Sequence, residues 1–154
     1  MCFSNSDYTG DPDSCQIVSG YMLFVQSVSI AWQSKAQKSV TLSSSGAEWT
    51  ALLDAVNEIM FIINLLESMK IKVKLPVIIR VNNTGEIFMG SNVTTTSRTK
   101  HVDIRTKYVR EYIEASVLKI IFVQSKDNTS DIVTKNVQGD LQDKHSKELV
   151  CEKL

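Results

Sequence analysis

The 154-residue chain has few of the features that mark specialised classes of protein. Its three cysteines, Cys2, Cys15 and Cys151, are far apart and form no CxxC or Cys/His spacing. An odd, dispersed set of this kind argues against a disulfide framework and against a structural zinc site. Proline and glycine are sparse, at two and six residues, and the sequence has no internal repeat or low-complexity segment.

Signals for secretion and membrane insertion are also missing. Residues 1–5 lack the basic-then-apolar order of a secretory signal sequence. The longest apolar stretch, residues 59–66, is interrupted by Asn64 and is too short to cross a bilayer. We therefore expect no membrane partner, and free thiols in a cytosolic or nuclear compartment.

Neither sign of charge is in excess, because 17 Lys and Arg residues balance 17 Asp and Glu residues. A neutral chain has no overall attraction for nucleic acid, so such binding requires a local basic patch. The length suits one compact domain. We expect this domain to cover residues 1–137, and residues 138–154 to form a peripheral helix or a loose tail.

Hydrophobic patterns predict alternating strands and helices. Residues 20–25 and 28–32 have the aromatic, β-branched or alternating character of paired strands joined by a short turn. A helical stripe of apolar residues runs from Ala47 to Leu66, and the serines at 43–45 are candidates for its N-cap.

Later segments continue this alternation. The patterns predict a strand at 77–81, a short helix at 85–89, a polar loop at 91–99, a helix at 102–115, a strand at 118–123 and a last core helix at 127–133. The order fits an α/β domain with a mixed sheet. Trp32 and Trp49 are expected to be core aromatics.

Six short motifs follow one another in the order typical of ribonuclease H domains from copia-type retrotransposon polyproteins. The family's SDADWAGD is similar to SNSDYTGD at residues 4–11, and its SGY and SW hairpin is similar to residues 19–21 and 31–35. Its LSSTEAEY is similar to LSSSGAEW at residues 42–49, and its CDNQ is similar to VNNT at residues 81–84. Its SRTKHIDIR is similar to SRTKHVDIR at residues 97–105, and its ADILTK is similar to SDIVTK at residues 130–135. Together the motifs cover residues 3–137. Each motif alone is weak, but the ordered set is specific.

This resemblance implies a ribonuclease H-like fold, with a mixed five-stranded sheet and helices packed on its faces. The family usually has more chain before the first motif, so we expect a clipped first strand. A polyprotein context would make a reverse transcriptase domain a partner of this one.

The resemblance also implies a chemistry. Enzymes of the family hydrolyse the RNA strand of an RNA–DNA hybrid with two Mg²⁺ ions held by four carboxylates. The matched positions here are Asn5, Glu48, Asn82 and Asp131. Two of these are neutral amides, and an amide oxygen cannot bridge two metals as a carboxylate does. We therefore expect weak or lost metal binding, with impaired catalysis.

Three acidic residues allow other interpretations. Asp7 lies two residues after Asn5 and would share its face of a strand, about 7 Å away, as a possible substitute ligand. The family already has Asp at this position, so its presence does not indicate compensation. Glu48 and Asp131 could instead be ordinary residues in the first turns of helices, where a carboxylate suits the helix dipole.

One dense basic cluster has two interpretations. It could contact phosphates of a hybrid, or it could be the solvated face of a helix. His101 could assist proton transfer, although a lone histidine is more often structural. The cluster consists of Arg98, Lys100, His101, Arg105, Lys107 and Arg110.

Three hypotheses follow. The chain is a degenerate ribonuclease H domain with little or no activity, a working nuclease that uses Asp7, Glu48 and Asp131, or a domesticated module that binds nucleic acid or protein. The first two differ in hydrolysis of a hybrid. The third requires binding that depends on the basic cluster.

Overall fold

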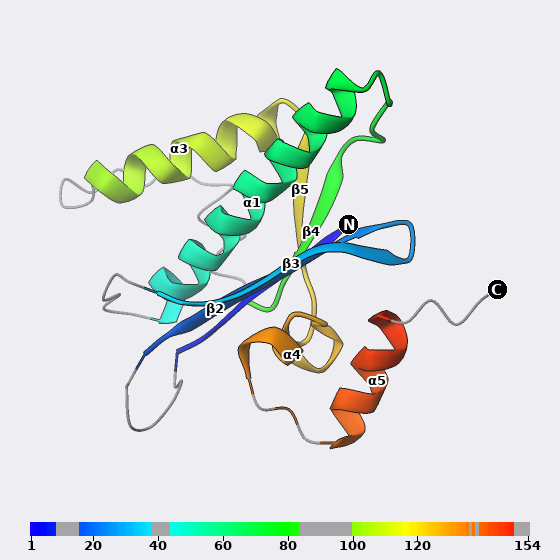
Figure 1. The fold of residues 1–154 in the computed structure, drawn as a ribbon. Coiled ribbons are helices and arrows are strands. Elements are labelled where there is room, and N and C mark those ends of the chain that lie inside the picture. The colour runs from blue at the N-terminus through cyan, green and yellow to red at the C-terminus, as the bar shows by residue number, and fades with distance from the viewer. Residues whose placement is uncertain (9–15, 38–43, 84–99, 136, 138, 150–154) are drawn as a thin grey trace.

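The computed structural model describes residues 1–8, 16–37, 44–83, 100–135, 137 and 139–149. A twisted sheet lies at the centre, with helices on both faces (Figure 1). The strands are β1 (Cys2–Asp7), β2 (Val18–Val25), β3 (Val28–Ala36), β4 (Val77–Val81) and β5 (Leu118–Phe122). The helices are α1 (Ser44–Ser68), α3 (Lys100–Glu114), the 3-10 turn η1 (Ser125–Asp127), α4 (Asp131–Thr134) and α5 (Gly139–Leu149).

The sheet has five strands in the order β3-β2-β1-β4-β5. The pairs β1–β2 and β2–β3 are antiparallel, whereas β1–β4 and β4–β5 are parallel. The mixed five-stranded sheet that the resemblance implied is therefore confirmed. All six residues of β1 pair with β2, but only Cys2 and Phe3 pair with β4. Because β1 and β4 are parallel neighbours, residues at their carboxyl ends meet at one edge of the sheet.

The predicted hairpin is present, with its turn at Gln26 and Ser27. Gln26 has a φ of 55°, in the left-handed region that a tight turn requires. Trp49 is buried, as predicted, but the prediction that Trp32 belongs to the core was wrong, because its side chain is 65% exposed. Trp32 lies on β3, which is an edge strand with a neighbour on one side only. Its ring therefore has neighbouring side chains from one adjacent strand instead of two.

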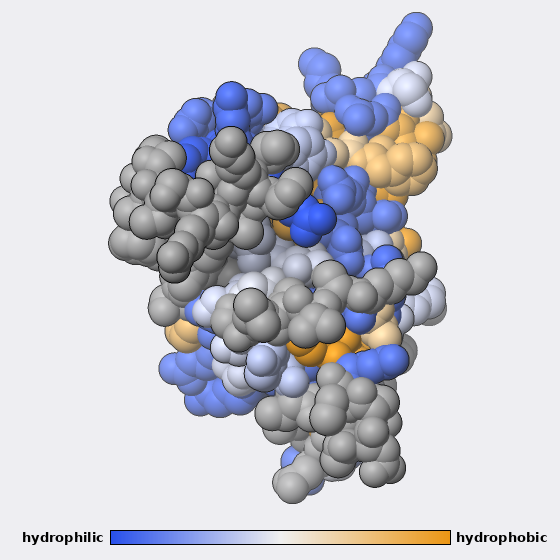
Figure 2. All heavy atoms as spheres, turned by 90° about the vertical axis from the view of Figure 1, so that its left-hand side faces the viewer, coloured by the Kyte–Doolittle hydropathy of each residue, from blue (hydrophilic) through white to orange (hydrophobic). Residues whose placement is uncertain are grey.

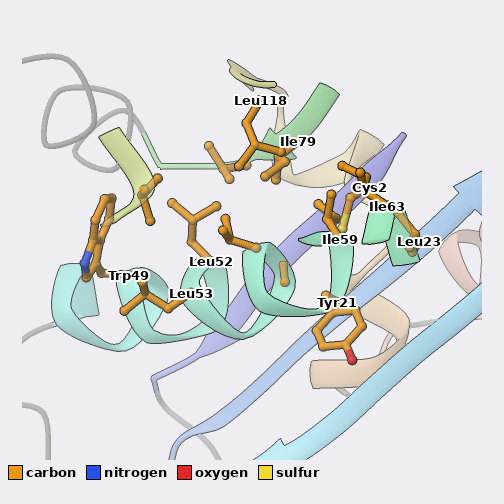
Figure 3. Close-up of a cluster of buried hydrophobic side chains, with 14 residues drawn as sticks. Cys2, Tyr21, Leu23, Trp49, Leu52, Leu53, Ile59, Ile63, Ile79 and Leu118 are labelled. Atoms are coloured by element: carbon orange, nitrogen blue, oxygen red, sulfur yellow. The ribbon is translucent and has the colours of Figure 1, made fainter. Parts of the chain in front are cut away.

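The main core lies between α1 and the sheet. Leu52 and Ile59 point from α1 toward Ile79 of β4 and Leu118 of β5 (Figure 3). Cys2 of β1 also lies in this cluster, and burial raises the pKa of its thiol to about 12. The predicted apolar stripe is thus the surface that seats α1 on the sheet.

The outer side of α1 remains apolar toward its C-terminal end. Phe61 and Leu65 of α1 and Met69 directly after it are spaced four residues apart, and all three are exposed. Hydrophobic side chains gather toward the top of the molecule in Figure 2, at the height of this end of α1 in Figure 1. By length and composition α1 could cross a bilayer. However, one of its faces is buried in the main core of the domain. These exposed residues lie far from Glu48, which is near the start of α1.

A smaller core lies on the other face of the sheet, where Figure 1 shows α4 and α5 across from α1. It consists of Phe3, Met22 and Phe24, with Ile132 and Val133 of α4 packed against them. This packing places the start of α4 over the middle of β1 and β2.

The structure differs from the prediction of one helix over residues 127–133. The 3-10 turn η1 and the single helical turn α4 are separate elements there. The Asn128 side chain explains the break, because its Oδ1 accepts hydrogen bonds from the Ser130 backbone N–H at 3.3 Å and from the Ser130 hydroxyl at 2.7 Å. Side-chain bonds of this kind compete with continuous helix. The Asn128 Nδ2 also donates to the Ser4 backbone carbonyl at 3.0 Å, tying this segment to β1.

The remaining predicted elements agree within a few residues. The helix expected at 102–115 is α3, and the strand expected at 118–123 is β5. α1 begins at Ser44, so two of the proposed N-cap serines lie inside the helix. Residues 85–89 and 91–99 lie outside the described residues. The segment expected as a peripheral helix or tail contains α5, and the domain boundary at 137 stays a prediction.

Gly20 of β2 allows α4 to approach the sheet closely. It pairs with Asn5 of β1, and a Cβ at this position would lie 2.7 Å from Val133 Cγ2 and 2.8 Å from Thr134 Cγ2. It would also lie 2.9 Å from the backbone oxygen of Gln33, which cannot rotate away. A side chain at position 20 must therefore displace α4 or distort the sheet.

We predict that Gly20→Ala lowers the free energy of unfolding by about 1–3 kcal/mol, as overpacking does. Urea unfolding followed by circular dichroism measures this. Gly139→Ala is the matched control, because a Cβ there meets nothing within 4 Å, and it should leave the urea midpoint unchanged or slightly raised. Equal midpoints for the two variants would show that α4 does not sit against Gly20.

Candidate functional site

The four positions matched to metal carboxylates come from separate elements at the carboxyl ends of β1 and β4. Asn5 lies in β1, Asn82 follows β4, Glu48 is the fifth residue of α1, and Asp131 begins α4. The structure brings Asn5 into direct contact with Asp131. Glu48 forms a side-chain hydrogen bond with Asn83, the residue after Asn82. The structure thus shows two separate contacts at these positions, and the four-residue metal set stays a prediction.

Asn5 acts as a hydrogen-bond donor in the site. Its residue is 1% exposed, and its Nδ2 donates to Asp131 Oδ1 at 2.5 Å and to Thr134 Oγ1 at 3.0 Å. The reversed amide would place its oxygen against an ionised carboxylate oxygen, so the donor orientation is chemically required. The Asn5 Oδ1 has no hydrogen-bond partner among the described residues.

Asp131 has a donor on each carboxylate oxygen. Oδ1 accepts from Asn5, and Oδ2 pairs with Lys135 Nζ at 3.2 Å. Burial raises the pKa of the Asp131 carboxyl, and the Lys135 ammonium acts in the opposite direction. Asp131 is thus held by protein groups on both oxygens.

Glu48 is less well satisfied. Burial raises the pKa of its carboxyl, while the hydrogen bond from Asn83 and the charge of Lys135 act in the opposite direction. Its Oε2 is buried and has no hydrogen-bond partner among the described residues. Lys135 therefore acts electrostatically on both remaining carboxylates of the set, Glu48 and Asp131.

Asn82 has its hydrogen-bond partner outside the matched set. Its Nδ2 donates to Ser125 Oγ at 3.0 Å, and this hydrogen bond is exposed to solvent. Ser125 belongs to η1, so Asn82 connects the end of β4 to the segment before α4. The amide serves as a link at the surface here.

Asp7 ends β1 and is partly buried. Its charge adds to burial in raising the pKa of Asp131, so the two carboxylates lie within electrostatic reach. However, no three His, Cys, Asp or Glu side chains among the described residues form a group that could hold a metal ion.

These residues do not fit a pair of Mg²⁺ ions. Such a pair needs several anionic oxygens directed at shared positions. Here an amide N–H group points at Asp131, and an ammonium covers its second oxygen. Within the four matched positions, the buried acceptors without a partner among the described residues are the neutral amide oxygen of Asn5 and one carboxylate oxygen of Glu48.

The basic cluster is described only in part. Arg98 lies outside the described residues, and Lys100 and His101 begin α3 without described side chains. Arg105 and Lys107 are exposed on α3, whose Val109 is buried, as expected for an amphipathic helix. Burial raises the pKa of the Asp54 carboxyl in α1, and the charge of Arg105 acts in the opposite direction.

Three participants were absent from the predicted site. Asn83 reaches Glu48, Lys135 reaches Asp131, and Thr134 accepts from Asn5. Thr134 and Lys135 stand in the SDIVTK motif, four residues or fewer from Asp131, so the helical spacing of that motif was an available signal. Asn83 stands in the VNNT motif, but nothing in that motif identified which of its two asparagines would reach α1.

Comparisons with known proteins agree with this geometry. No established protein-family profile matches the chain. The chain is 30% identical over 133 residues to the retrovirus-related Pol polyprotein from transposon RE1 of Arabidopsis thaliana, covering 86% of this chain and 9% of that protein. It is 29% identical over 135 residues to the Pol polyprotein from transposon TNT 1-94 of Nicotiana tabacum, covering 88% and 10%. The chain thus spans about a tenth of these relatives.

Solved structures show the same fold. LC11-RNase H1, isolated from compost by a metagenomic approach, matches with a TM-score of 0.62 and 13% identity, covering 86% of this chain and 89% of that chain. LC11-RNase H1 in complex with an RNA/DNA hybrid matches with a TM-score of 0.57, 15% identity and coverage of 86% and 91%. The ordered motifs, the Pol relatives and the shared fold agree. The chain belongs to the ribonuclease H domains of copia-type retrotransposon Pol polyproteins.

Proposed function

We propose that this chain is a ribonuclease H domain in which two-metal hydrolysis of RNA in RNA–DNA hybrids is severely impaired. The observation that carries the proposal is the hydrogen bond from Asn5 Nδ2 to Asp131 Oδ1. It directs an N–H donor at the carboxylate where the family would have a metal cation between two acids. Hydrolysis is the activity of the family, and impairment is specific to this chain.

Charge supports the proposal. Two of the four matched positions carry no charge, so the set supplies about two negative charges for two dications. The Lys135 ammonium, 3.2 Å from Asp131, further lowers the attraction for cations. Glu48 and Asp131 are the residues that would hold any remaining Mg²⁺.

One observation favours a working nuclease instead. Asp7 lies within electrostatic reach of Asp131, so Asp7, Glu48 and Asp131 are the substitute set that a working nuclease would use. A turn at the end of β1 would have to direct Asp7 into the site. The two possibilities differ in whether the wild-type chain cleaves a hybrid.

We predict no Mg²⁺-dependent cleavage of a labelled RNA–DNA hybrid by the wild-type chain above an inactive control. Asn5→Asp with Asn82→Asp should raise the rate by roughly 100-fold or more, because metals contribute several kcal/mol of transition-state stabilisation. Clear wild-type cleavage that Glu48→Gln abolishes would overturn the proposal. A folded double variant with no gain in metal binding would show that positions 5 and 82 were wrongly matched.

We also propose that the chain retains affinity for nucleic acid through its basic cluster, as a module without catalysis. A solved relative of the same fold is described in complex with an RNA/DNA hybrid. The exposed Arg105 and Lys107 supply part of a positive surface on α3. In a polyprotein, a reverse transcriptase domain would be the neighbouring partner, and a cytoplasmic or nuclear location would suit both.

We predict that the wild-type chain binds a hybrid and that Arg98→Ala with Lys100→Ala weakens this binding. The slope of log affinity against log salt should fall by about 1–2, because two phosphate contacts are lost. Lys70→Ala with Lys72→Ala is the matched control, since both lysines are exposed beyond the far end of α1. Wild-type binding no stronger than that of a neutral control protein would remove the binding function.

A further inference from the structure

The contact between β1 and the segment 125–135 has two polar links. The Asn5 side chain reaches both Asp131 and Thr134. The Asn128 side chain reaches the Ser4 carbonyl. All five of these residues are buried, so each link is shielded from water.

The Asn5 link is sensitive to charge. Asn5 Nδ2 and Asp131 Oδ1 are 2.5 Å apart, and this close contact is attractive because an N–H group donates to a carboxylate oxygen. Two ionised carboxylates at that distance repel each other strongly in a buried site unless a cation lies between them. An acid at position 5 would therefore make the seating of α4 dependent on a bound cation.

The structure assigns Asn5 the role of a metal-independent clasp that holds α4 on β1. Its amide supplies the donor that the buried Asp131 needs, and Thr134 accepts the second N–H of the same group. Lys135 completes the arrangement on the outer oxygen of Asp131. In this chain the contact between β1 and α4 therefore forms without a divalent ion. The inference concerns stability, so it does not depend on whether the chain retains any cleavage.

Thermal unfolding of the full chain tests the clasp, with each protein melted in EDTA and in excess Mg²⁺. Asn5→Asp is the test variant. Asn64→Asp is the matched control, because it makes the same charge change at an exposed residue of α1 that lies outside the four matched positions.

We expect the wild-type Tm to be the same in both buffers. Asn5→Asp should lower the Tm in EDTA by at least about 5 °C, and Mg²⁺ should restore most of the loss. Asn64→Asp should change the Tm by less than about 2 °C in either buffer.

Three outcomes would overturn the clasp. The first is a wild-type Tm that rises in Mg²⁺ as much as that of Asn5→Asp. The second is Asn5→Asp as stable as wild type in EDTA. The third is Asn5→Asp unfolded in both buffers, because a cation should then bridge the two acids. The melting experiment does not involve hybrid cleavage. The clasp and the proposed loss of cleavage can therefore be refuted independently of each other.

Discussion

The hydrogen bond between Asn5 and Asp131 is the contact on which the rest of the site depends. It joins the central strand to the turn of helix that carries the last matched carboxylate. Gly20 leaves the space for that turn, and Asn128 fixes the chain leading into it. Lys135 and Asp131 pair within one turn of helix, so this seating is what brings the Lys135 charge within reach of Glu48 on the neighbouring element.

Fold and chemistry have different requirements in this architecture. The sheet and α1 are specified by many apolar side chains, so exchanges among apolar residues of similar volume are tolerated. A two-metal centre depends on a few anionic oxygens in defined positions, and two neutral substitutions change it completely. The chain can therefore keep the ribonuclease H fold at 13% identity to a solved relative while its site presents hydrogen-bond donors.

Most of the fold could be predicted from the sequence, because strands and helices follow hydrophobic periodicity. The hairpin turn at Gln26, the long core helix and β4 after Pro76 all appear in the structure. Trp32 was misassigned, because periodicity cannot show which strand lies at an edge of the sheet. The last helix was predicted too long, because the Asn128 side chain competes with the helix through bonds that periodicity does not detect.

The motif order placed Asn5 and Asp131 in one site, and the structure joins them. It could not show that the Asn5 amide would turn its nitrogen toward Asp131, or that Asn83 and not Asn82 would reach Glu48. Those details depend on side-chain rotation and on which acceptors are buried nearby. They decide whether the site receives a cation or excludes one.

The central claim is that protein donors occupy the positions where metal cations would lie. Mg²⁺ titration of ¹⁵N-labelled protein tests it most directly, with the Asn5 side-chain amide and the backbone signals near Glu48 and Asp131 followed by NMR. The account predicts that these signals show only the small, non-saturating shifts that added salt produces. Saturable shifts centred on Asn5, Glu48 and Asp131 would contradict it.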